Sequence, residues 1–182
     1  MSDLIKGFFS FSVFGVLIAA CYLWVLFSRR SFLSKGLGPL VPLVNGTLHY
    51  EQTRVTLRGT YQGFPVWVIH TLGGQDFPDL FTLETEVPGK SDWVLGYGKE
   101  KLLARDRWYF KTGDEFLKAR LEESGLLAKM EGWKSRPTIQ FKAHEGKLNY
   151  TEDGYPPAAE RFKQQLDLLT WLCKLNLRMN SR

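Results

Sequence analysis

The stretch from Gly7 to Phe27 carries no charged residue, and it constrains the fold of this chain more than any other feature. As an α-helix, these 21 residues would be about 31 Å long, which matches the roughly 30 Å hydrocarbon core of a bilayer. A cleaved secretory signal has a shorter apolar core and small residues at its cleavage site, whereas Tyr22 and Trp24 stand near the end of this run. The pattern therefore predicts one uncleaved transmembrane helix.

One alternative remains open at the same segment. Ile18, Ala19, Ala20 and Cys21 have the aliphatic, small, small, cysteine order that bacterial lipoprotein signals use. Lipidation at Cys21 would place the following domain outside the cytoplasm. Against this alternative, the residues after Cys21 are apolar up to Phe27, where a mature lipoprotein has a polar tether.

Basic residues at the two ends of the span predict its orientation. Lys6 precedes the helix alone, whereas Arg29, Arg30 and Lys35 follow it. Lys and Arg are retained on the cytoplasmic side of a membrane, so we expect the C-terminal domain to face the cytoplasm.

Within the span, a second pattern concerns helix packing: Gly15 and Ala19 form a small-x-x-x-small pair, which would let a second helix approach closely in lipid.

The positive charge of the chain belongs largely to the anchor. The formal net charge is +5, and four of the 24 basic residues but only one of the 19 acidic residues lie within residues 1–35. The remainder of the chain, with 20 basic and 18 acidic residues, is nearly balanced. Attraction to anionic lipid explains the excess, so we expect the membrane bilayer and other membrane protein subunits as partners, and no nucleic acid.

The rest of the chain predicts an α+β fold, in which a small domain with a mainly antiparallel β-sheet and a C-terminal amphipathic helix follows the transmembrane helix. We divide the chain into an anchor with its flanks at 1–30, a short Gly/Pro linker at 31–46 and a soluble α+β domain at 47–182. Gly36, Gly38, Pro39 and Pro42 predict that the linker avoids regular helix.

Hydrophobic periodicity places the strands. Residues 54–70 read as a hairpin with a turn at 62–63, and the apolar run 66–69 predicts a second strand buried on both faces. We interpret 115–123 as a strand, although Leu117 and Leu121 also fit one helix face, and we interpret 126–133 as a short helix. The further strands are expected at 80–87, 93–95, 107–110, 138–143 and 147–151.

The best helix signal after the span runs from Pro156 to about Arg178. Its apolar side chains recur at spacings of four, three and four residues and would face the sheet; they are Phe162, Leu166, Leu169 and Cys173. Cys173 is expected to be a small buried residue, since Cys21 in the membrane cannot pair with it.

The sequence offers no strong catalytic or metal-binding pattern. His49, His70 and His144 show no metal-ligand spacing, so we expect no metal and no cofactor. A general base built from His70 with Asp76 and Asp79 remains a weak alternative, and substituting these residues and His144 would test it.

These observations favour a binding protein over an enzyme. We expect a single-span accessory, assembly or regulatory subunit of a membrane protein complex. The alternative is a membrane-tethered sensor that binds a small ligand or a lipid head group.

Overall fold

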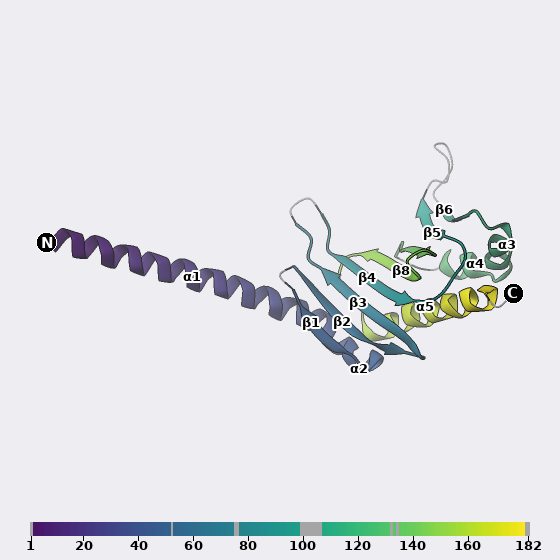
Figure 1. Ribbon diagram of the computed structural model, residues 1–182, viewed down its shortest axis with the longest axis horizontal. Helices are drawn as coiled ribbons and strands as arrows, with labels where there is room; N and C mark the ends of the chain where they lie inside the picture. The colour runs from purple at the N-terminus through teal and green to yellow at the C-terminus, as the bar shows by residue number, and fades with distance from the viewer. Residues whose placement is uncertain are drawn as a thin grey trace.

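The computed structural model describes the backbone of residues 2–51, 53–74, 77–98, 107–131, 133 and 135–180, with side chains for the same residues except 2–14, 29, 129, 131, 179 and 180. A long helix projects from a domain in which helices pack against one face of a broad sheet (Figure 1). The elements in chain order are α1 (Ser2–Leu37), η1 (Gly38–Leu40), α2 (Val41–Val44), β1 (Thr47–Tyr50), β2 (Arg54–Tyr61), β3 (Phe64–Thr71), β4 (Leu80–Glu86), β5 (Trp93–Gly98), β6 (Arg107–Thr112), α3 (Glu115–Glu123), α4 (Leu126–Glu131), β7 (Thr138–Lys142), β8 (Lys147–Asp153) and α5 (Ala159–Asn180).

The sheet has eight strands in the order β1-β2-β3-β4-β8-β7-β5-β6, and every neighbouring pair is antiparallel. This confirms the predicted α+β fold with a mainly antiparallel sheet. The β2–β3 hairpin turns at Gln62 and Gly63, which both have positive φ, as a two-residue hairpin turn requires. The short strand β1, for which the sequence shows no strand pattern, pairs with β2 at the sheet edge.

One face of the sheet, which we call the inner face, holds the hydrophobic core. Successive strand residues point to opposite faces, and the inner positions are buried, as Val55 and Leu57 on β2 illustrate. Helix α5 covers this face with the apolar stripe expected from the sequence: Phe162, Leu166, Leu169 and Cys173 are all at most 2% exposed. The free, buried state of Cys173 confirms the prediction for this residue.

The expectation that residues 31–46 avoid helix is wrong. Helix α1 continues to Leu37, and η1 and α2 follow it without a break. Each of these short helices has its proline in the first turn, where the missing N–H costs no hydrogen bond. The apolar residues of the segment belong to the domain core and are at most 1% exposed: Leu33, Leu37, Leu40 and Val44.

Two further expectations differ from the structure. Residues 115–123 form helix α3 and not a strand, because Asp114 caps its N-terminus by accepting a hydrogen bond from the Leu117 amide at 3.1 Å. Strand β3 is buried on one face alone, since Trp67 and Ile69 on its other face remain partly exposed. The other predicted strands, and the helices at 126–133 and near the C-terminus, are confirmed apart from shifts at their ends.

The segment Gly15–Val44 is helical, long and apolar enough to cross a membrane, a property that membrane spans share with signal sequences. Almost none of its most apolar part is buried against the domain. The exposed large apolar side chains here are Val16, Leu17, Ile18, Tyr22, Leu23, Trp24, Val25 and Phe27.

The end of α1 should contribute to the stability of the domain. Replacing Leu37, which is fully buried, with alanine is expected to lower the free energy of unfolding by about 3 kcal/mol, because a large apolar side chain leaves a cavity. Lys35→Ala, on the exposed side of the same helix, should change it by less than about 0.5 kcal/mol. Denaturant unfolding of both variants in detergent measures the difference, and equal stabilities would contradict this packing.

Candidate functional site

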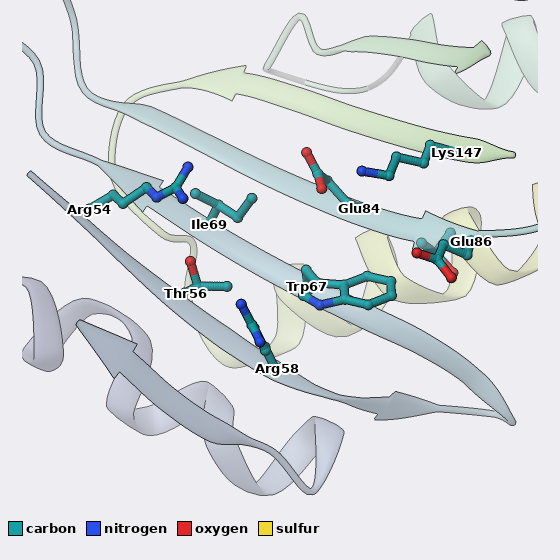
Figure 2. A pocket seen from close by; sticks show the side chains of 9 residues that line it. Arg54, Thr56, Arg58, Trp67, Ile69, Glu84, Glu86 and Lys147 are labelled. Atoms are coloured by element: carbon teal, nitrogen blue, oxygen red, sulfur yellow. The ribbon is translucent and has the colours of Figure 1, made fainter. Parts of the chain in front are cut away.

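A hollow lies on the outer face of the sheet, the face opposite the core. It has a volume of about 460 Å³. Figure 2 shows its labelled side chains extending from β2, β3, β4 and β8. We call it the outer groove, and its lining residues are Arg54, Thr56, Arg58, Trp67, Ile69, Glu84, Thr85, Glu86 and Lys147.

Strand register places charges and apolar groups in bands across the outer groove. Trp67 lies between Arg58 on β2 and Glu84 on β4, because it pairs with both. Glu86 pairs in turn with Lys147 on β8. From β2 to β8, the outer groove therefore carries a cationic band on β2, an apolar band on β3, an anionic band on β4 and one lysine on β8.

Most charges of the outer groove are not neutralised by a close partner. Arg54 is the exception, since its guanidinium donates to both carboxylate oxygens of Glu51 at 2.6 and 2.9 Å. That pair raises the pKa of Arg54 and lowers the pKa of Glu51. Among the described residues, no ion pair within 4 Å involves Arg58, Glu84, Glu86 or Lys147.

This arrangement suits the recognition of another molecule through an aromatic anchor and charged contacts. Tryptophan and arginine are the residues that most often dominate binding energy at protein interfaces. Charges of both signs around Trp67 would select a partner surface with the opposite pattern. A partly exposed tryptophan among charges without close partners thus marks the outer groove as the candidate binding site.

A second feature is a buried histidine where α1 meets the sheet. His70 is 0% exposed, and neither ring nitrogen has a hydrogen-bond partner among the described residues. Its Nε2 lies 3.9 Å from Oδ2 of Asp79, and its ring packs edge-on against Tyr155 at 5.8 Å. Burial lowers the pKa of His70, although the Asp79 charge opposes this shift.

The residues of the weak general-base alternative are only partly brought together. Asp79 is near His70, but its Oδ1 already accepts the Gly73 amide at 2.7 Å. Asp76 lies outside the described residues. His144 stands in the turn before β8. The first residue of β8, Lys147, pairs with Glu86 at one end of β4, whereas His70 pairs with Phe81 near the other end. His144 and His70 therefore cannot share a site.

The membrane-related residues predicted from the sequence lie along α1. Gly15 and Ala19 are on an exposed part of the helix, and among the described residues no atom outside the neighbouring helix backbone comes within 4 Å of a Cβ placed on Gly15. Arg30 stacks its guanidinium over the Tyr50 ring at 4.4 Å, and Lys35 is exposed. The side chains of Lys6 and Arg29 lie outside the described residues.

A smaller groove lies between α4 and α5, with a volume of about 280 Å³. Its lining is mainly apolar, with two polar residues, and consists of Ser124, Leu126, Met130, Trp133, Gln164, Leu168 and Trp171.

In the described part of the chain, no three His, Cys, Asp or Glu side chains gather as a metal site would require. Burial raises the pKa of the Cys173 thiol to about 12, so this cysteine stays protonated.

Neither groove was predicted from the sequence. The alternation of Arg54, Thr56 and Arg58 does indicate a polar strand face, but the apolar run 66–69 concealed that Trp67 shares this face.

Comparisons of the chain with protein-family models, curated proteins and solved structures find no match. The chemistry of the sites therefore rests on their own geometry.

His70 should make the stability of the domain depend on pH. Its pKa in the folded protein is below the unfolded value near 6.5, so the unfolded chain takes up this proton more readily. Its contribution is fully present above pH 6.5 and is lost as the pH falls below that value. We expect the free energy of unfolding to fall between pH 7 and pH 5, and to fall less in His70→Gln.

The exposed His144 provides the control, because His144→Gln should keep the full pH dependence. Urea unfolding of the three proteins in detergent at both pH values measures the effect. An unchanged pH dependence in His70→Gln would show that His70 is not the group responsible.

Proposed function

We propose that this protein is a single-span membrane protein whose domain binds a partner protein through the outer groove, as an accessory, assembly or regulatory subunit of a membrane complex. The observation that carries the proposal is the unequal covering of the sheet. The described helices cover the inner face (Figure 1), whereas Trp67 and Ile69 stay partly exposed on the other face. A protein segment with complementary charges would cover both side chains.

The exposure of α1 supports the membrane anchor. A helix with large apolar side chains such as Leu23 and Trp24 more than 60% exposed would aggregate in water. Insertion into lipid would remove these side chains from water. The basic residues Arg29, Arg30 and Lys35 favour a cytoplasmic domain. The small pair Gly15 and Ala19 then faces lipid or a second helix. Lipidation at Cys21 is the alternative, and it would place the domain outside the cytoplasm.

The shape of the outer groove favours a protein partner over a metabolite. Sites for small molecules are usually concave and mainly apolar, with few polar groups. The outer groove is instead lined by five charged side chains and lies open on a sheet surface. Non-obligate protein interfaces are as a whole about as polar as the rest of a protein surface, with aromatic and arginine side chains enriched in them.

A second candidate function is the sensing of a small apolar ligand or lipid in the α4–α5 groove. Its apolar lining around Ser124 and Gln164 resembles ligand sites in composition, and its volume of about 280 Å³ is near the lower limit for such sites. A ligand bound there would raise the unfolding temperature of the protein. A lipid and metabolite panel without any such shift would remove this candidate.

Extraction in mild detergent, followed by size separation and mass spectrometry, tests the proposed function. We expect the native protein in a stoichiometric complex, and Arg58→Glu or Trp67→Ala should reduce the recovered partner about tenfold by removing one dominant contact. Arg120→Glu on α3 is the matched control, because this exposed arginine lies outside the outer groove.

The comparison among variants decides the outcome. Loss of the partner in Arg58→Glu with retention in Arg120→Glu supports the outer groove as the interface. A lone chain in the native extract contradicts the proposed function. Equal recovery from all variants contradicts the location of the interface.

A further inference from the structure

The edge of the domain that surrounds α1 carries exposed aromatic side chains. Phe77 is 75% exposed, Tyr155 is 62% exposed and Phe32, on α1 itself, is 46% exposed. Tyr50 at the end of β1 lies on the same edge, in contact with Arg30. We call these four residues the aromatic rim. Tyrosine is favoured at the level of lipid head groups, and phenylalanine contributes apolar surface that is buried at the boundary between head groups and acyl chains.

Contacts along α1 fix the height of the aromatic rim. Arg30 stacks on Tyr50, and Phe32 packs edge-on against Tyr155 with ring centroids 5.5 Å apart. At 1.5 Å per residue, these contacts lie about 5 and 8 Å beyond Phe27, the last residue of the uncharged run. The interfacial zone on each side of the hydrocarbon core is about 5–8 Å deep. The rim therefore falls at head-group level when α1 spans the bilayer.

Phe77 belongs to this edge because the loops there are tied together. The Leu72 amide donates to the Thr53 carbonyl at 2.9 Å, and the Gly154 amide donates to the Asp79 carbonyl at 2.7 Å. Strand β3 ends and β4 begins on the side of the sheet from which α1 projects (Figure 1).

The backbone at Phe77 is also held closely. A Cβ on Gly73 would come within 2.1 Å of the Phe77 carbonyl oxygen, so only glycine allows this approach. The neighbouring Gly73 amide donates to Asp79 at 2.7 Å. The backbone of Phe77 is therefore held in place by Gly73, and its side chain is exposed from this fixed backbone.

We propose that Phe77 and Tyr155 insert into the interfacial region of the bilayer, giving the domain a second lipid contact beside α1. This inference rests on the proposed function, because it needs α1 to be membrane-inserted. The occupant is the lipid surface itself. The aromatic rim would then hold the outer groove beside the membrane, at a fixed height where a partner in the same bilayer can reach it.

The test places a fluorescent probe on the full-length protein in lipid vesicles. A single cysteine replaces Phe77 in a Cys21→Ser chain, and Cys173 stays unlabelled because it is buried. The probe is an environment-sensitive NBD dye, and the vesicles contain phosphatidylcholine, phosphatidylglycerol and a lipid with a nitroxide near its head group. Phe116→Cys is the matched control, since this phenylalanine is 51% exposed on α3, at the other end of the domain (Figure 1).

We expect about twofold stronger nitroxide quenching and a blue-shifted emission at position 77 relative to position 116, as insertion beside lipid head groups requires. Equal quenching at both positions would overturn the inference. A probe on native Cys21, which lies about 9 Å inside the hydrocarbon core from Phe27, separates the two proposals through its emission. A blue-shifted emission at Cys21 without quenching at 77 overturns the rim contact alone, whereas a water-like emission at Cys21 overturns the membrane anchor and the rim contact together.

Discussion

The burial of the last part of α1 in the domain core is the interaction on which the rest of the structure depends. Leu33 and Leu37 are at most 1% exposed, and α1 lies against β1 and β2. The chain then continues through η1, which lies against α5, and α2, which lies against β2. A Cβ on Gly59 would meet the Val44 carbonyl oxygen at 2.2 Å, so β2 and α2 touch backbone to backbone. The exposed apolar helix and the sheet are therefore parts of one packed unit.

Because of this packing, the inner face of the sheet is covered by helices and the outer face is not covered by the described helices. The inner face is occupied by α5 and by the end of α1. Its buried polar groups are only partly satisfied among the described residues: the Gln165 amide donates to the Tyr150 hydroxyl at 3.0 Å, whereas Gln165 Oε1 and both ring nitrogens of His70 have no hydrogen-bond partner. The outer face keeps Trp67 between unlike charges. An antiparallel sheet can leave one face in water, but a tryptophan at the centre of that face is better suited to a binding partner. The two proposals, a protein in the outer groove and lipid at the aromatic rim, use surfaces that the core leaves uncovered.

Much of the fold could be predicted from the sequence, because hydrophobic periodicity reports which side of an element is buried. The α5 stripe and the hairpin at Gln62 and Gly63 follow such local rules. The linker prediction failed because proline excludes a helix interior but suits a first turn, and the prolines of residues 31–46 occupy first turns. Helix α3 was missed because Leu117 and Leu121 fit both periods, and the Asp114 cap decided between them.

The candidate sites were harder to predict, since they depend on strand order. Arg58, Trp67, Glu84 and Lys147 are far apart in the sequence and come together only through the pairing of β2, β3, β4 and β8. His70 was singled out as a possible base, yet its distinguishing property is complete burial against α1, which no local pattern indicates. The aromatic rim likewise follows from the contacts of Arg30 and Phe32 with strand and loop residues.

A distance measurement between α1 and the far end of the domain tests the central claim most directly. Nitroxide labels at Phe27→Cys and Phe116→Cys, in a Cys21→Ser chain reconstituted in vesicles, would be measured by double electron–electron resonance. Because the end of α1 is part of the core, the account predicts one narrow distance distribution that agrees with the structure. A broad distribution, as a flexible linker at 31–46 would produce, would contradict it.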